Sequence, residues 1–356
     1  MERRTRIRTT NWYSWLNFPY RQLIKQYYMK RACPAILFHG PQGLGLKSLI
    51  WKISSWLMCS FSKELQSCGI CHNCNLMKVG SHPDLVTIES SPSIGIDIIR
   101  NLYDKIFQHS QLGRSKVIWI AEADKLTEAA SHALLKTLEE PPDNTYFFLY
   151  SSDPSKLSAI LRSRCQSWKI IPPIESEGIQ WIKLKLNSPR YNHITEANII
   201  AALRIASGAP LAAADLLASM YWTYRQKIYE IIRDVLNKKQ DILKILPLLK
   251  NENVNKQIEG LCTLFLDAIK LQYDSNIFII NYDFKNLVQQ LSICSVEILY
   301  ESFRNWLILR HLFTQVISVN RQLLLTEQLL KWKELIDHSN KRDKKYVFSR
   351  FSLSSK

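Results

Sequence analysis

The sequence has no apolar run long enough to cross a membrane. None of its uninterrupted apolar stretches approaches the roughly 18 residues that a membrane span requires. The amino terminus, MERRTRIRTTNWYSW, is basic like the start of a signal peptide, but no apolar segment follows it. We therefore expect a cytoplasmic protein with no membrane partner.

Acidic residues are scarce beside basic ones. The 356 residues include 31 Asp and Glu against 47 Lys and Arg, a net charge of +16 at pH 7. This excess favours a polyanionic partner, with nucleic acid as the first candidate. A solvated basic surface is the alternative, because net charge bears on association and not on fold. The hydrophobic content of 46% and the chain length indicate a packed protein of two or three domains.

Three short apolar runs predict buried parallel strands. They are AILFHG before a glycine-rich loop, KVIWIAEAD around Ile118 and TYFFLYSS around Phe148. Helix-like segments join these runs, as βαβ units require. One of them, LTEAASHALLKTLEEPP, predicts a helix that Pro141 and Pro142 end.

The strand signals fade beyond Ile171, and the rest of the chain has helical periodicity. One candidate helix places Leu299, Phe303, Trp306 and Leu307 on one face, which we expect to pack into a core. We divide the chain into an α/β domain, a small helical domain, a larger helical domain and a basic tail, with these expected ranges: 1–170, 171–217, 218–338 and 339–356.

A glycine-rich loop, GPQGLGLKS, follows the first apolar run. A phosphate-binding loop has the pattern Gly-x-x-x-x-Gly-Lys-Ser/Thr: its glycines let backbone N–H groups cradle phosphate, its lysine meets the outer phosphates and its hydroxyl holds magnesium. Here Leu46 separates Gly45 from Lys47 and rotates the lysine by about 100° if a helix has begun there. The candidate nucleotide-binding residues are Gly40, Gly43, Gly45, Lys47 and Ser48. We expect this degenerate loop to be inactive in catalysis, with weak phosphate binding by its backbone amides left open.

Four of the eight cysteines are crowded into segment 59–74, CSFSKELQSCGICHNC. Overlapping Cys-x-x-Cys turns bring three thiolates together, and the fourth completes a tetrahedral, closed structural zinc site. The expected zinc ligands are Cys59, Cys68, Cys71 and Cys74. Free thiols and a redox pair are the alternatives. His72 and His82 could each replace a cysteine but are expected to be bystanders.

Taken in chain order, the motifs are specific for one family. They are WYSWL, GPQGLGLKS, the four-cysteine insert, GSHPDL, KVIWIAEADKLTEAASHALLKTLEEPP and LRSRC. This series resembles the bacterial clamp-loader subunits of DNA polymerase III, members of the AAA+ superfamily. The segment NRQLLLTEQLL is similar to the collar helices of these subunits. The resemblance implies a P-loop NTPase-like parallel sheet with a zinc module, a helical lid and an all-helical collar for oligomerisation.

Within this family the nucleotide motifs separate ATP-hydrolysing motor subunits (γ/τ) from the others, and this sequence departs from the motor pattern three times. Leu46 displaces Lys47, Ala121 stands where a magnesium-side aspartate is expected, and Leu211 stands where motor subunits place an arginine. Glu122 keeps the position that orients the attacking water. The resemblance thus favours a subunit that does not bind ATP productively and catalyses no reaction by itself. It implies that the subunit is part of a DNA polymerase holoenzyme in which other chains carry out nucleotidyl transfer.

The motif LRSRC matches the family pattern without change. In the family, the arginine of Ser-Arg-Cys projects into the nucleotide site of a neighbouring subunit, and the matching residue here is Arg164. Its guanidinium would neutralise charge that develops on the transferred phosphoryl group. Without the family match, a surface arginine at a helix end would be the simpler interpretation.

The resemblance also implies the partners. They are the γ/τ and δ subunits of the loader, the sliding clamp indirectly, and primer–template DNA within the complex, at the replisome. Two other functions stay open at this point: an active AAA+ ATPase of the motor type, and a zinc-containing nucleic-acid-binding protein outside any clamp loader.

Overall fold

The structure, a computed structural model, describes residues 11–89, 92–108, 110–112, 114–191, 193–249, 253–274, 278–315 and 320–351. It divides into two compact units that meet between Ile174 and Glu175. The first ten residues of the expected α/β domain and the last five of the expected tail lie outside the described residues. In the part of the chain that the structure describes, no helix is long and apolar enough to cross a membrane.

The first unit is built on a parallel sheet with helices on both faces. Its strand order is β2-β3-β4-β1-β5, and every neighbouring pair is parallel. The strands are β1 Ala35–His39, β2 Leu85–Ile88, β3 Lys116–Ile120, β4 Thr145–Ser151 and β5 Gln166–Lys169. The expected architecture, a parallel α/β sheet followed by helices, is confirmed.

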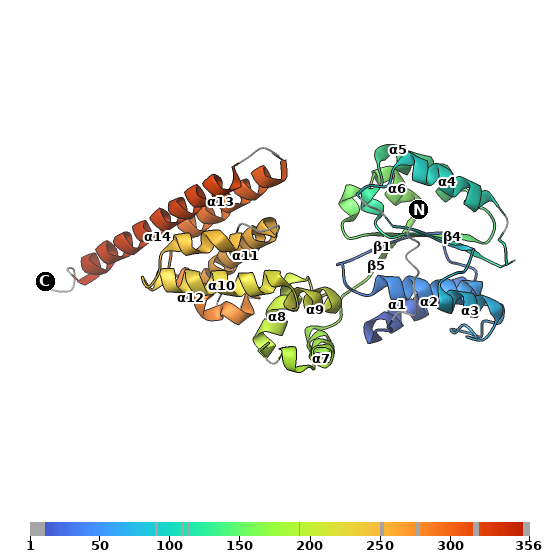
Figure 1. The fold of residues 1–356 in the computed structure, drawn as a ribbon, viewed down its shortest axis with the longest axis horizontal. Coiled ribbons are helices and arrows are strands. Elements are labelled where there is room, and N and C mark those ends of the chain that lie inside the picture. The colour runs from blue at the N-terminus through green and yellow to red at the C-terminus, as the bar shows by residue number, and fades with distance from the viewer. Residues whose placement is uncertain are drawn as a thin grey trace. The chain divides into compact units, whose positions relative to one another are not determined.

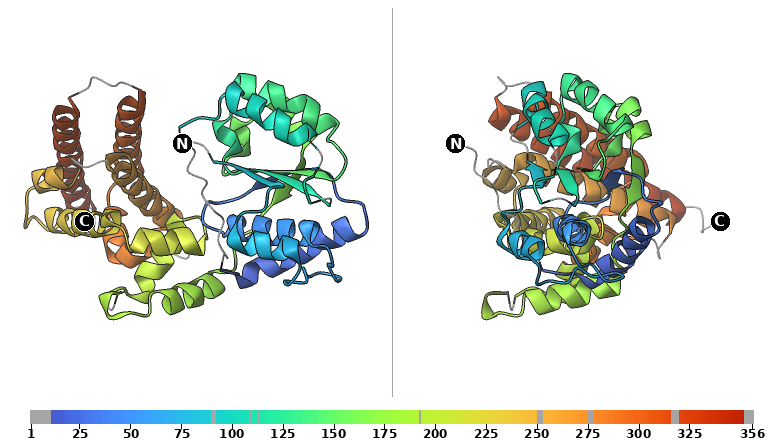
Figure 2. Two further views of the ribbon diagram at one scale, coloured as in Figure 1. Left: turned by 45° about the vertical axis from the view of Figure 1, so that its right-hand side comes forward. Right: turned by 90° about the vertical axis from the view of Figure 1, so that its right-hand side faces the viewer.

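Figure 1 shows α1, α2 and α3 on one face of this sheet and α4, α5 and α6 on the other. The helices are α1 Asn17–Tyr28, α2 Leu46–Met58, α3 His72–Val79, α4 Ile96–Phe107, α5 Glu128–Glu139 and α6 Ala159–Arg164. Single 3-10 turns are η1 Ser14–Leu16, η2 Ala123–Lys125 and η3 Pro154–Lys156. The left-hand view in Figure 2 shows the same two layers of helices around the sheet.

The three strands predicted from apolar runs, β1, β3 and β4, are the inner strands of the sheet. Each residue of β3 is buried, as expected for a parallel strand covered by helices on both faces. The predicted helix after β3 is α5: Thr127 Oγ1 caps it by accepting from Ala130 N–H at 3.2 Å, and it ends at Glu139, before Pro141. Both predictions are confirmed.

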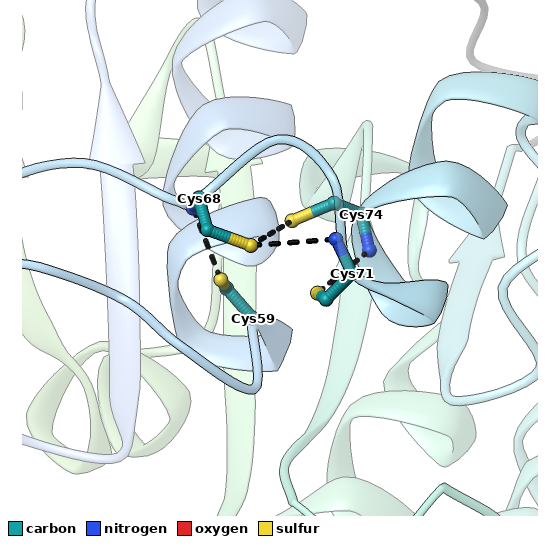
Figure 3. Close-up of side chains that lie close together, drawn as sticks. All are labelled: Cys59, Cys68, Cys71 and Cys74. Carbon is teal, nitrogen blue, oxygen red and sulfur yellow. Dashed lines mark hydrogen bonds between the residues drawn. The ribbon is translucent and has the colours of Figure 1, made fainter.

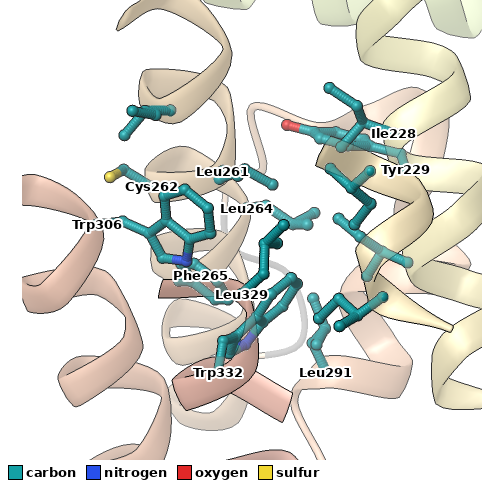
Figure 4. Close-up of a cluster of buried hydrophobic side chains, with 14 of the residues drawn as sticks. Ile228, Tyr229, Leu261, Cys262, Leu264, Phe265, Leu291, Trp306, Leu329 and Trp332 are labelled. Atoms are coloured by element: carbon teal, nitrogen blue, oxygen red, sulfur yellow. The ribbon is translucent and has the colours of Figure 1, made fainter. Parts of the chain in front are cut away.

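The second unit is helical throughout its described residues. Its elements are α7 Glu175–Lys185, η4 Pro189–Tyr191, α8 Glu196–Ile205, α9 Pro210–Leu217, α10 Met220–Leu236, η5 Ile242–Leu249, α11 Val254–Tyr273, η6 Tyr282–Phe284, α12 Lys285–Leu291, α13 Val296–Gln315 and α14 Arg321–Phe351. Helices α7, α8 and α9 pack around one small core. Helices α10 to α14 enclose a larger one, in which the rings of Trp306 and Trp332 lie 6.4 Å apart and nearly perpendicular (Figure 4).

One core prediction for α13 is wrong. Leu299 and Trp306 are buried as expected and Phe303 is partly buried, but the side chain of Leu307 is 43% exposed. The buried stripe of α13 runs through Leu299, Trp306, Leu309 and Phe313, so Leu307 lies about 100° around the helix from it.

A buried polar network joins the small helical core to the larger one. Arg225 of α10 donates to both carboxylate oxygens of Asp283 at 2.7 and 2.9 Å and to Asn281 Oδ1 at 2.9 Å. Asn198 of α8 donates to Asp283 Oδ2 at 3.4 Å from the other side. Because these contacts cross between the two cores, α7 to α14 form one compact unit. Helix α14 runs to Phe351 and so crosses the tail boundary expected at 338.

Candidate functional site

The four cysteines of the insert converge on one point. Cys59 follows the last residue of α2, Cys68 lies in the loop, and Cys71 and Cys74 lie at the start of α3. Figure 3 shows these side chains gathered from the three segments. Asn73 fixes the two helices to each other because its buried side-chain amide donates to Met58 O at 2.8 Å.

The geometry of the cluster fits a tetrahedral metal ion. All four sulfur atoms lie within 4.8 Å of one another, and Cys68 Sγ and Cys74 Sγ are 3.9 Å apart. Metal–sulfur bonds of about 2.3 Å in a tetrahedron place sulfur atoms about 3.8 Å apart. Backbone N–H groups of Cys68, Cys71 and Cys74 point at sulfurs of the cluster, with N–S distances of 3.2 to 3.4 Å. Such N–H donors stabilise thiolates, which are the ligand form.

The thiols differ in how readily they ionise. Burial acts to raise the pKa of Cys71, but the N–H groups of Cys74 and Ser60 outweigh it and lower the pKa to about 6. Burial raises the pKa of Cys74 to about 12 and also raises that of Cys59. A divalent cation would supply the attraction that lets the more buried thiols ionise too. Neither histidine belongs to the group of clustered side chains: His72 is exposed, and His82 Nδ1 accepts from Asp84 N–H at 3.2 Å.

The glycine-rich loop keeps a phosphate-loop position between β1 and α2. Gly45 caps α2 in the left-handed region (φ 82°), and Leu46 is the first helical residue. The amino-terminal aromatic segment packs on this loop. A Cβ atom at Gly45 would lie 2.5 Å from two ring carbons of Tyr13, and Trp15 Nε1 donates to Leu44 O at 2.9 Å.

The loop lysine already contacts an anion of its own chain. Lys47 Nζ lies 2.8 Å from Glu89 Oε1, just after β2. Ser48, which would present the magnesium-binding hydroxyl, is buried in the first turn of α2, and its N–H donates to Gly45 O at 2.9 Å. The lysine and serine are therefore the second and third residues of α2.

The remaining residues at which the sequence was compared with ATP-hydrolysing motor subunits lie in both units. Ala121 follows β3 and is buried, and Glu122 forms an ion pair with Lys125 at 2.8 Å. Burial raises the pKa of Tyr150 to about 12, helped by nearby Asp124 and Glu122, and its hydroxyl donates to Gly40 O at 3.1 Å. Leu211 is the second residue of α9, in the second unit.

Arg164 is the last residue of α6. Its Nε atom lies 2.8 Å from Glu139 Oε1, and the two side chains are 49% and 41% exposed. Cys165 caps the helix and is buried, and Ser163 Oγ donates to Ile160 O at 2.8 Å. The Ser-Arg-Cys turn thus presents its arginine at the surface while its cysteine anchors the backbone.

The sheet separates Arg164 from the loop. Strands β1 and β5 are parallel, with Ile36 beside Gln166. The loop follows the carboxyl end of β1, whereas Arg164 precedes the amino end of β5. These two edges are one strand length apart, about 16 Å for the five residues of β1. Of the predicted residues, the structure brings together the four cysteines and, separately, the loop residues, and it keeps Arg164 apart from both.

Three contacts of these sites involve residues that the motif patterns do not single out. Glu89 contacts Lys47, Glu139 contacts Arg164, and Tyr13 covers Gly45. Each carboxylate meets its partner through the packing of different elements, which residue spacing does not predict. Tyr13 belongs to the motif WYSWL, and the aromatic residues of this motif were the sequence feature that could have indicated packing on the loop.

Comparison with known proteins gives consistent matches along the chain. A family model described as "DNA polymerase III, delta subunit" matches residues 17–173. A second, described as "DNA polymerase III, delta subunit, C terminal", matches residues 219–334.

Individual proteins match over most of the chain. "DNA polymerase III subunit delta'" of Yersinia pestis is 42% identical over 327 residues, which are 91% of this chain and 96% of the relative. The protein of the same name from Escherichia coli (strain K12) is 33% identical, covering 90% of this chain and 95% of its own length. "DNA polymerase III subunit tau" of the same strain is 36% identical over 131 residues, 37% of this chain and 20% of the relative.

Proposed function

This chain belongs to the family of DNA polymerase III delta' subunits, and from that premise we propose that it is the clamp-loader subunit that does not hydrolyse ATP and lends Arg164 to a neighbour. The family membership gives it a clamp-loader role in DNA replication. The division of labour within the loader is the proposal.

Three features of the candidate nucleotide site support a subunit without productive ATP binding. Lys47 lies within the first turn of α2 and contacts Glu89 at 2.8 Å, so an incoming phosphate would have to displace a carboxylate. Tyr13 packs directly on Gly45, where a phosphate loop needs open backbone N–H groups. Ala121 offers no carboxylate for magnesium at the end of β3.

The observation that carries the trans role of Arg164 is its position at the opposite sheet edge from the chain's own loop. About 16 Å of strand lies between the two edges, so this guanidinium cannot reach a nucleotide held by its own loop. A half-exposed arginine at a helix end can instead enter a site on another subunit. There its planar fork would stabilise charge on the transferred phosphoryl group.

We assign the cysteine cluster to structural zinc. Four thiolates around one ion leave no position for water or substrate, so such a site supports the fold of its segment. Cys59, Cys68, Cys71 and Cys74 would hold the ion, and the ion would join the end of α2 to the start of α3. The metal thereby contributes to folding and not to reaction chemistry.

The proposed partners are the γ/τ and δ subunits, primer–template DNA and, through the complex, the sliding clamp. Helix α13 supports an assembly surface because Leu307, Ile308 and Leu312 are all more than a third exposed on it. The net charge of +16 supports a nucleic-acid partner.

The test is ATP hydrolysis by a loader reconstituted with motor subunits, stimulated by DNA and clamp. Arg164→Ala should still fold and join the complex, and the neighbouring site should still bind ATP. Its hydrolysis should fall steeply, since trans arginines contribute about 10³-fold or more. Arg164→Lys should restore little, because lysine keeps the charge but lacks the planar fork.

Arg162→Ala is the matched control, an exposed arginine two residues earlier in the same helix, and should hydrolyse ATP at the normal rate. Normal ATPase in a fully assembled Arg164→Ala complex would contradict the trans role. ATP hydrolysis by this chain alone would contradict its non-hydrolysing role and favour the motor type.

A further inference from the structure

The contact between Glu139 and Arg164 joins two motifs that lie 25 residues apart in the sequence. Glu139 is the last residue of α5 and belongs to LLKTLEEPP, and Arg164 is the last residue of α6 and belongs to LRSRC. The proposed function gives a role to the arginine and leaves the carboxylate without one.

The backbones on both sides of this contact are anchored in the same core. Leu138, which precedes Glu139, is 4% exposed, and Cys165, which follows Arg164, is 8% exposed. Both belong to the apolar cluster between the sheet and helices α4, α5 and α6, together with Leu134 and Leu161. Two side chains that start from fixed backbone positions can define each other's direction.

The contact itself contributes little to folding. Both side chains are nearly half exposed, and ion pairs at that exposure are screened by water and gain little net stability. Its effect is on the conformation of Arg164. A free arginine side chain samples many rotamers. A carboxylate at Nε restricts these rotamers before the guanidinium meets a phosphoryl group.

The atoms involved leave the arginine able to bind phosphate. Glu139 Oε1 lies beside Nε, on the inner part of the guanidinium. The Nη donors form the outer fork, which is the part that meets a phosphoryl group in a bidentate way. A carboxylate beside Nε therefore orients the guanidinium and leaves the Nη–H donors that point away from it for a phosphoryl group.

We propose that Glu139 is a positioning residue for Arg164, holding the guanidinium so that its outer fork faces a nucleotide on the neighbouring subunit. This inference rests on the proposed trans role. Preorganisation of this kind lowers the entropy lost when the transition state forms, so it acts on the rate of hydrolysis more than on ATP binding.

The experiment measures kcat and KM for ATP in the reconstituted loader with Glu139→Ala, Glu139→Gln and the double variant Glu139→Ala/Arg164→Ala. Glu139→Ala should lower kcat by about 3- to 10-fold with KM unchanged, in the range of couplings between contacting side chains. Glu139→Gln keeps an oxygen acceptor at the same place and should lose less. The double variant should be no slower than Arg164→Ala, because the carboxylate acts only through the arginine.

Glu140→Gln is the matched control. It removes the same charge one residue later, from an exposed side chain for which no ion pair occurs among the described residues. It should leave kcat unchanged, which separates positioning from a general effect of local charge.

The outcomes separate the two proposals. If Arg164→Ala is slow while Glu139→Ala hydrolyses ATP at the normal rate or faster, the positioning role is overturned and the trans role stands. If Arg164→Ala is itself normal, the trans role fails and the positioning role fails with it. A further loss in the double variant would show that Glu139 acts independently of Arg164 and would overturn the inference.

Discussion

Lys47, one residue beyond the place of a phosphate-binding lysine, contacts Glu89 at 2.8 Å with more than half of its side chain exposed. An ion pair at this exposure stabilises a protein by about 0 to 1 kcal/mol. The lysine is therefore neither a structural necessity nor, on the proposed function, a phosphate ligand.

Lys47→Ala should leave the reconstituted loader nearly as active as the unmodified one. Stability should change by no more than about 1 kcal/mol, because only an exposed pair is lost. The measurement is clamp loading on primed DNA, beside a loader whose motor subunits carry the equivalent loop-lysine change, which should be inactive. A loss as large as in that second loader would mean that the loop of this chain binds nucleotide productively.

Arg225 shows the opposite situation, a charge that is almost completely buried. Its side chain is 1% exposed, that of Asp283 is 2% exposed, and both carboxylate oxygens accept from the guanidinium. The rings of Trp222 and Tyr229 flank the cation at 4.7 and 4.5 Å. Removing one partner leaves an uncompensated charge in the interior.

Arg225→Met should lower the free energy of unfolding of the second unit by about 3 to 5 kcal/mol. Arg233→Met, on the same helix with the arginine half exposed, should lower it by less than about 1 kcal/mol. Urea denaturation of the full chain, followed by tryptophan fluorescence and circular dichroism, measures both. Equal small losses would show that the buried pair contributes far less than its burial implies.

At the scale of elements, the buried strands could be predicted from the sequence and the more exposed strands could not. The inner strands β1, β3 and β4 are covered on both faces and therefore consist of apolar runs. The edge strands β2 and β5 lie at the sheet's two margins. In β5, with the sequence QSWK, half of the residues are exposed, so a search for apolar runs passes over it. Four residues also give too little length for a periodic signal.

The same contrast applies to the candidate sites. The cysteine cluster was predictable because its ligands are close in sequence and local turns bring them together. The contacts of Glu89 and Glu139 were not predictable, because each carboxylate meets its partner from a different element. Leu307 was wrongly assigned to the core because helical spacing gives the width of an apolar face only roughly.

For the cysteine insert we predict one zinc ion per chain in freshly purified, reduced protein. Serine at Cys59, Cys68, Cys71 or Cys74 should release the ion and destabilise the insert, because structural zinc supplies local folding free energy. Cys262→Ser, at a buried cysteine of α11 far from the cluster in sequence, should keep the full metal content. Elemental analysis measures the content, and protein without stoichiometric metal would count against the site.

At the scale of the whole molecule, the second unit combines a closed core with an apolar surface. Leu309 and Phe313 of α13 face the core, whereas Leu307, Ile308 and Leu312 are exposed. Helix α14 adds exposed Leu323 and Leu330. Several exposed leucine and isoleucine side chains on two packed helices are typical of surfaces that another chain covers.

A charge on this surface should weaken assembly without unfolding the chain. Ile308→Asp should reduce incorporation into the loader by about 10-fold or more at limiting concentration, since burial of an unpaired carboxylate in an apolar interface costs several kcal/mol. Ile293→Asp, at an exposed apolar residue between α12 and α13, is the control and should assemble normally. Gel filtration and analytical ultracentrifugation measure incorporation, and normal assembly of the Ile308 variant would place the contact elsewhere.

Helix α2 begins at Leu46, just after Gly45 and the ring of Tyr13 that packs on it, and ends at Met58, next to Cys59 of the cluster. Its thirteen residues span about 20 Å. On the proposed zinc assignment, aromatic packing secures the first end of α2 and a metal ion would secure the second, and only the metal ion can be removed chemically. Helices open from the end that has lost its restraint. Removal of the metal should therefore produce a gradient of deuterium uptake along α2, fastest near Met58 and slowest near Ser48. The exchange rates of the backbone amides of this helix would then show whether the cluster holds a metal ion.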